Sequence, residues 1–135
     1  MSQLLQISDL SICFDHGPPA VESLSLAIRE GETLALVGES GSGKSTVLRA
    51  LCGLAPVTGG RISIAGKPVS TPRDPAFYRR VQMVFQDPYA SLHPRHTIDK
   101  VLSEQPAIHD FDRREQRVEQ ALDEVGLGAG FPFRY

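Results

Sequence analysis

The sequence of 135 residues predicts an α/β fold in which a glycine loop joins a buried strand to a helix. Three adjoining segments carry this prediction. The apolar run 33–37 has the length and composition of a buried parallel strand. The loop 38–46 fits the pattern G-x-x-x-x-G-K-[ST]. After the loop, apolar residues recur at helical spacing: Val47, Leu48, Leu51 and Leu54. Gly53 is a candidate C-cap for this helix.

The glycine loop has the chemistry that binds phosphate groups. Glycines allow a tight turn in which backbone N–H groups approach phosphate oxygens with no Cβ between them. A helix that begins near Gly43 would point the positive end of its dipole at the same anion. Lys44 would reach the β- and γ-phosphates, and the Ser45 hydroxyl would coordinate Mg²⁺. The predicted phosphate-binding residues are Gly38, Glu39, Ser40, Gly41, Ser42, Gly43, Lys44, Ser45 and Thr46. The alternative, a glycine-rich turn that binds nothing, is disfavoured because Lys44 stands at the required offset after a strand.

Further strands are predicted on both sides of this loop. Apolar residues alternate within 3–14 and again within 24–28, which predicts an antiparallel strand pair with one buried face. A short strand is expected over 61–66 and another over 81–85. The polar segment 72–80 is expected to form one helical turn.

Two helices are predicted near the end of the sequence. Thr97 is a candidate N-cap for a helix over 98–105, which Pro106 would end. Asp112 and Glu115 resemble a capping box for a second helix, which Gly126 would end. One face of that helix is apolar, with Val118, Ala121, Leu122 and Val125.

Composition and charge narrow the class of protein. The chain is 41% hydrophobic and 22% charged, as in an ordinary globular protein, and its net charge of −2 argues against a nucleic-acid-binding surface. No run of 18 apolar residues occurs, so we expect no direct membrane insertion. The spacing of Cys13 and Cys52 fits neither a zinc site nor a disulfide framework. His93 and His96 have the spacing of a metal clamp on a helix, but Pro94 between them argues against one.

Two further positions complete a family resemblance. Phe14 stands 24 residues before the glycine loop, and Gln86 ends the apolar run 81–85, 42 residues after Lys44. Together with the loop, they resemble the first half of the nucleotide-binding domain of ATP-binding-cassette (ABC) transporters. The segment 81–95, VQMVFQDPYASLHPR, is similar to the branch that imports oligopeptides, dipeptides and nickel. That branch usually has Asn where this chain has His93. The resemblance covers nearly the whole sequence.

This resemblance implies a fold and a set of site residues. The fold would be an α/β P-loop NTPase fold in one incomplete domain, 1–135. An N-terminal antiparallel β-subdomain and part of the core sheet with the Q-loop would occupy about 1–95, and the start of a helical subdomain about 96–135. Phe14 would stack on adenine, Lys44 and Gln86 would have catalytic roles, and Ser45 with Gln86 would hold the metal. The implied cofactors are ATP and Mg²⁺.

The resemblance also implies a function, partners and a location. The function would be that of the ATP-binding component of an importer for peptides or nickel, which couples ATP binding and hydrolysis to transport. The loop 86–95 would contact integral membrane permease subunits. A second ATP-binding subunit would complete the site, and the protein would lie on the cytoplasmic side, peripheral to the inner face of the cell membrane.

Several family motifs are not found in the sequence. There is no signature of the LSGGQ type, no apolar strand that ends in Asp-Glu, and no later switch histidine. In the family these motifs follow a segment like 130–135, so we expect an N-terminal fragment. Whether this chain alone is an enzyme is left undecided: we expect weak nucleotide binding and negligible hydrolysis. We also expect marginal stability, because apolar sheet edges would be unpaired at Leu34, Leu36, Val81, Met83 and Phe85.

Three alternatives remain open at this stage. The chain could be another P-loop enzyme, such as a small kinase or GTPase, with Asp87 on Mg²⁺, although Gln82 and Pro88 interrupt the pattern and no NKxD motif occurs. It could be a non-catalytic nucleotide-binding or regulatory fragment. It could also be a non-transport ABC ATPase, which the similarity of 86–95 to importers disfavours.

Overall fold

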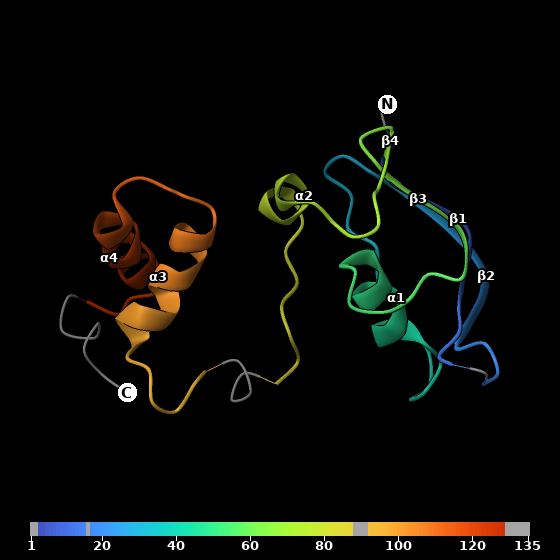
Figure 1. Cartoon of the computed structure of the whole chain (residues 1–135), viewed down its shortest axis with the longest axis horizontal. Helices are drawn as coiled ribbons and strands as arrows, with labels where there is room; N and C mark the ends of the chain where they lie inside the picture. Colours follow the sequence, from blue (N-terminus) through green and yellow to red (C-terminus); the bar gives the residue numbers. More distant parts are fainter. Residues whose placement is uncertain (1–2, 16, 88–91, 129–135) are drawn as a thin grey trace. The chain divides into compact units, whose positions relative to one another are not determined.

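A computed structural model describes residues 3–15, 17–87 and 92–128 of the chain. The chain divides into two compact units, residues 1–83 and 84–135, which are described separately below (Figure 1). The first contains the sheet and the glycine loop, and the second contains two helices.

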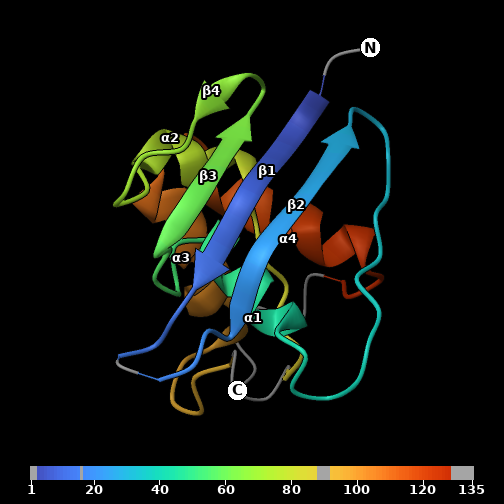
Figure 2. The ribbon, with the colours of Figure 1, turned by 90° about the vertical axis from the view of Figure 1, so that its right-hand side faces the viewer.

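The first unit is built on an antiparallel sheet. Its strands are β1 (Gln3–Ile12), β2 (Val21–Arg29), β3 (Gly59–Ile64) and β4 (Lys67–Pro68), in the spatial order β2-β1-β3-β4 (Figure 2). The predicted pair of strands is confirmed, because β1 and β2 are hydrogen-bonded antiparallel neighbours. The strand expected over 61–66 is also present, two residues earlier, whereas β4 was not predicted.

A bulge in β1 directs its apolar side chains to one face. Asp9 has a left-handed backbone with φ 51°, and the pairing register shifts between Ile7 and Leu10. Strict alternation would place residues 7 and 10 on opposite faces, and the extra residue of a bulge corrects this. Ile7, Leu10 and Ile12 are therefore all buried, with at most 2% of their surface exposed.

The helix α1 (Lys44–Leu51) covers that face of the sheet (Figures 1 and 2). Its buried residues Val47 and Ala50 belong to one apolar core with Ile62 and the buried residues of β1. The predicted helix is thus confirmed, and Gly53 follows it with φ 78°. The Gly53 N–H donates to Ala50 O at 3.1 Å and the Leu54 N–H to Arg49 O at 2.7 Å, the two bonds of a Schellman motif.

Two apolar runs predicted as strands, 33–37 and 81–85, have no strand structure. Val37 is 90% exposed and Val84 is 95% exposed. A parallel strand is stable only when neighbouring strands satisfy its backbone N–H and C=O groups. Neither run pairs with a strand in the part of the chain that the structure describes. Their composition favours strands, but the described residues include no neighbouring strands that hydrogen-bond to them.

The segment 72–80 contains a short helix, α2 (Pro75–Arg80), whose 6 residues exceed the single turn that the sequence predicted. Asp74 is its N-cap, and the Asp74 carboxylate accepts a hydrogen bond from the Phe77 N–H at 2.6 Å. The helix begins with Pro75, whose missing N–H costs nothing at the first helical position.

The second unit contains α3 (Ile98–Ile108) and α4 (Arg114–Glu124), and several details differ from the sequence prediction. Pro106 does not end α3 but lies inside it, because the single hydrogen bond lost to proline falls near a helix end that is only two residues away. Thr97 is the N-cap of α3, but its side chain makes no capping bond.

The predicted capping box of α4 is wrong. Arg113, with φ 55°, is the N-cap, and the Asp112 carbonyl instead accepts a hydrogen bond from Arg117 Nε at 3.1 Å. On the predicted apolar face, Val118 and Leu122 are buried. The other two residues are not: Ala121 is exposed, and Val125 is 69% exposed. Gly126 follows the helix with φ 76°, as expected for a helix terminator.

Candidate functional site

The glycine loop leads into α1 at Gly43, a position where only glycine fits. Gly43 is the N-cap of α1, with φ 89°. A Cβ at this position would lie 2.7 Å from the Ala20 carbonyl oxygen and 3.0 Å from Val21 Cγ2. The loop therefore packs directly on the chain that leads into β2. The motif indicated a glycine at this position for phosphate approach, and the tertiary contact gives a second reason for it.

The Lys44 side chain points back into its own loop. Its ammonium donates hydrogen bonds to Gly38 O at 2.8 Å, to Glu39 O at 2.5 Å and to Ser42 Oγ at 3.1 Å. The loop is thus wrapped around a positive charge. Oxygens of a phosphate chain are the same kind of acceptor as these loop oxygens, and an anionic acceptor binds an ammonium more strongly than a neutral carbonyl. The residues present fit a phosphate-bearing ligand.

The N-terminus of α1 contributes to the same region. Lys44 is the first residue of the helix, and among the described residues no side chain caps this end. An uncapped N-terminus has N–H groups available to an anion, together with the positive end of the helix dipole. Ser45 is exposed and Thr46 is half-buried in this first turn. The position of Ser45 is compatible with its predicted role as a metal ligand, which stays a prediction.

Phe14 lies in the connection between β1 and β2, with 48% of its surface exposed. The Ala20 N–H donates to Ile12 O at 2.8 Å, which closes this connection onto the end of β1. The same connection contacts Gly43 through Ala20. The structure therefore brings the segment that bears Phe14 beside the start of α1. The stacking of Phe14 on adenine remains a prediction.

Gln86 is exposed and belongs to the second unit, whereas Lys44 belongs to the first. The predicted meeting of Gln86 and Ser45 around a metal ion therefore remains a prediction. Residues 88–91 of the predicted permease-contacting loop 86–95 lie outside the described residues, as does the segment 130–135.

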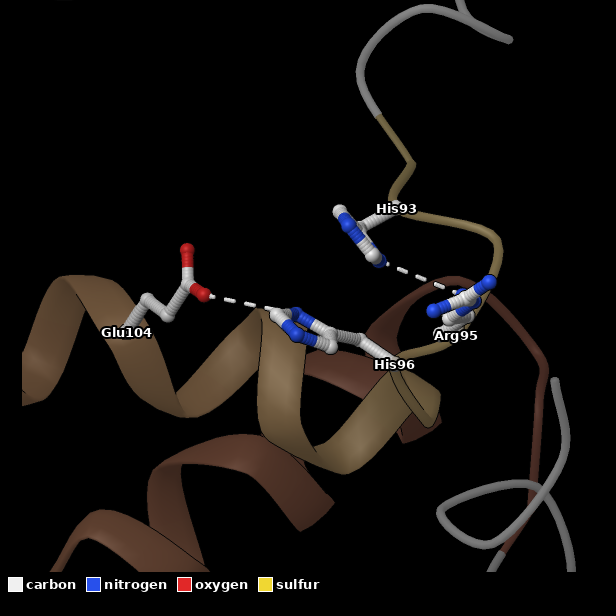
Figure 3. Close-up of polar contacts among 4 residues, drawn as sticks. All are labelled: His93, Arg95, His96 and Glu104. Atoms are coloured by element: carbon white, nitrogen blue, oxygen red, sulfur yellow. Dashed lines mark hydrogen bonds and ion pairs between the residues drawn. The ribbon is translucent and has the colours of Figure 1, made fainter.

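His93 and His96 form a stacked pair (Figure 3). Their ring centroids are 4.2 Å apart, His93 Nδ1 accepts the Arg95 N–H at 3.2 Å, and His96 Nδ1 lies 3.7 Å from Glu104 Oε1. Desolvation, together with the charges of Lys100 and His93, lowers the pKa of His96, and Glu104 opposes this shift. The described residues include no group of three His, Cys, Asp or Glu side chains arranged to hold a metal ion.

Comparison with known proteins decides the family. Residues 21–132 match the sequence profile described as ABC transporter, which covers most of the chain. The chain belongs to the ABC transporter family. This ABC chain is 40% identical to the oligopeptide transport ATP-binding protein AmiF of Streptococcus pneumoniae, over 98% of its own length and 47% of that protein. It is 36% identical to the oligopeptide transport ATP-binding protein OppF of Streptococcus pyogenes, with the same coverage.

A solved structure supports the same fold. CbiO1 of Clostridium perfringens, described as part of the ABC transporter complex cbiONQ, is 25% identical to the ABC chain with a TM-score of 0.79. The match covers 98% of the ABC chain and 54% of CbiO1. The predicted P-loop NTPase fold of ABC nucleotide-binding domains is therefore confirmed. The chain spans about half the length of the relatives and of the solved structure that it matches.

Members of the ABC ATPase family generally bind nucleotide with Mg²⁺, and the relatives named above are ATP-binding proteins of transport systems. Over the described ranges of the ABC chain, no helix is both long and apolar enough to cross a bilayer.

Proposed function

We propose that this chain is the ATP-binding part of an importer that moves peptides across a cell membrane. One observation carries the proposal: the glycine loop of an ABC family member holds the Lys44 ammonium at the N-terminus of a helix. The relatives named above are oligopeptide transport proteins, so the proposal takes peptides as the solute; these relatives give nickel no support.

The proposed site assigns each part of Mg·ATP to residues of this chain. Gly38 to Thr46 would surround the phosphates, with the Lys44 ammonium exchanging its loop oxygens for phosphate oxygens. Phe14 would stack on the adenine, and Ser45 with Gln86 would hold Mg²⁺. When bound, ATP would supply the γ-phosphoryl group, whose transfer to water, with ADP as the leaving group, would drive transport. A permease contacting the loop 86–95, a second ATP-binding subunit and a place at the inner face of the cell membrane complete the proposal.

The binding part of this proposal is tested by calorimetric titration of the chain with Mg·ATP. Replacement Lys44→Ala is expected to weaken binding about 10- to 100-fold, because a hydrogen bond to a charged group is lost at the phosphates. Lys67→Ala on β4 is the matched control, since Lys67 is an exposed lysine of the sheet outside the glycine loop. Circular dichroism verifies that both variants fold. Equal affinities for the three proteins would contradict the assignment of Lys44.

The transport part is tested on the protein expressed at its full natural length. Mild detergent extraction is expected to recover it together with integral membrane permease subunits. Recovery free of membrane proteins would contradict the importer assignment and leave nucleotide binding as the supported activity.

A further inference from the structure

Arg73 makes a set of contacts that no sequence motif predicted. It lies between β4 and α2 and is half-buried. Its Nε donates to the Leu51 carbonyl at 3.1 Å and its Nη2 to the Ala50 carbonyl at 2.8 Å. Both carbonyls belong to the last turn of α1. The side chain of Arg73 therefore contacts the end of α1 that is opposite to Lys44.

The same guanidinium also bonds to its own segment. Nη1 donates to the Ser70 carbonyl at 2.6 Å and to Thr71 Oγ1 at 3.3 Å. The planar guanidinium, with several donors in fixed positions, thus joins two stretches of chain. Arg73 is 22 residues from Leu51 and 23 residues from Ala50 in the sequence.

The surroundings of Arg73 are shaped to hold it. A Cβ at Gly53 would lie 2.8 Å from Arg73 Cγ, so this glycine leaves room for the side chain. The Phe77 ring centroid is 5.4 Å from Arg73 Cζ, within range of a cation–π contact. The Tyr78 hydroxyl of α2 donates to the Cys52 carbonyl at 3.4 Å, so α2 itself is also linked to the end of α1.

Physical chemistry explains why an arginine suits this position. The last carbonyls of a helix have no partners within the helix and carry the negative end of its dipole. The Schellman bonds at Gly53 and Leu54 satisfy part of this end. Arg73 supplies a permanent positive charge and two further donors. The contact therefore stabilises α1 by both charge and hydrogen bonding.

We propose that Arg73 is a positioning residue for the phosphate site: it holds the C-terminal end of α1 so that Lys44 and the N–H groups at the other end keep their place. This proposal rests on the proposed nucleotide-binding function. An eight-residue helix is only about 12 Å long, so a shift at one end is transmitted to the other. At its start α1 is held by the packing of Gly43 on Ala20, and at its end by Arg73.

Hydrogen exchange measures the anchoring directly, without any nucleotide. In Arg73→Ala, the backbone amides of residues 48–54 are expected to exchange about 10- to 100-fold faster, since two hydrogen bonds to a charged group are lost. Arg61→Ala on β3 is the matched control, because Arg61 is an exposed arginine of the same unit. Equal exchange of these amides in the two variants would overturn the proposal.

Nucleotide binding then separates positioning from general stability. At a temperature where circular dichroism shows every variant folded, Arg73→Ala is expected to weaken Mg·ATP binding about tenfold and to leave binding of a fluorescent, phosphate-free adenosine analogue unchanged. Arg73→Lys keeps the charge but offers one nitrogen, so it is expected to recover part of the Mg·ATP affinity. Equal losses for both ligands, or no loss for Mg·ATP, would overturn the positioning role.

Mg·ATP binding by the wild-type chain distinguishes failure of the proposed function from failure of the positioning role of Arg73. If the wild-type chain binds Mg·ATP no better than Lys44→Ala, the proposed function fails and the positioning role fails with it. If the wild-type chain binds Mg·ATP more tightly than Lys44→Ala, and Arg73→Ala binds it as tightly as the wild type, the proposed function stands and the inference about Arg73 is wrong.

Discussion

Replacement of Gly43 by alanine tests how tightly the glycine loop is packed on the sheet. The new Cβ would lie 2.7 Å from the Ala20 carbonyl oxygen, which is backbone and cannot rotate away. Alanine would also have to adopt φ 89°, a left-handed conformation. The backbone strain costs about 1–2 kcal/mol. Overpacking adds about 1–3 kcal/mol. The expected loss in the free energy of unfolding is therefore about 2–5 kcal/mol.

Gly41→Ala is the matched control for this experiment. Gly41 has nearly the same φ, 85°, but its Cβ would meet nothing within 4 Å. It should lose only the strain of about 1–2 kcal/mol. Urea unfolding followed by far-UV circular dichroism gives both values, and the difference between the variants isolates the contact with Ala20. Equal destabilisation of the two variants would refute the close approach of the loop to β2.

Two further predictions concern the second unit. Because folding lowers the pKa of His96, the unfolded chain binds more protons than the folded chain as the pH falls through about 6.5, and stability should fall over that window. Thermal unfolding at pH 7.5 and 5.5 should show this loss for the wild type and a smaller loss for His96→Gln; the same loss in both would contradict it. Leu122→Ala should destabilise the unit by about 2–5 kcal/mol, because it removes a buried side chain that is 3% exposed. Val125→Ala, at a position 69% exposed, should change the free energy of unfolding by no more than about 0.5 kcal/mol in the same urea titrations. Comparable losses at both positions would show that the packing of α4 has been misassigned.

Features whose cause is local were readable from the sequence. The glycine loop, the first turn of α1 and the glycines that end α1 and α4 depend on backbone conformations that residue types close in the sequence favour. The β1–β2 pair was readable for a similar reason, since its apolar alternation and the short connection favour antiparallel pairing. Phe14 and Gln86 were found only through the family resemblance, and their contacts with nucleotide remain predictions.

Errors arose where a local signal competes with its surroundings. Pro106 lowers the tendency to form a helix, yet α3 continues past it to Ile108. Asp112 and Glu115 have the spacing of a capping box, but the chain enters α4 through Arg113 in a left-handed conformation. Short polar motifs are satisfied by several backbone paths, so their spacing alone does not select one.

The sequence by itself determined the family, the phosphate-binding loop and the order of most elements, because these depend on residue types at fixed spacing. The tertiary structure decided which side chains meet across long separations. It placed Gly43 on Ala20 and Arg73 on the end of α1, contacts that follow from how the sheet and helix pack. It also decided that the runs 33–37 and 81–85 are not strands, because a strand exists only through hydrogen bonds to a neighbour and no sequence pattern supplies that neighbour.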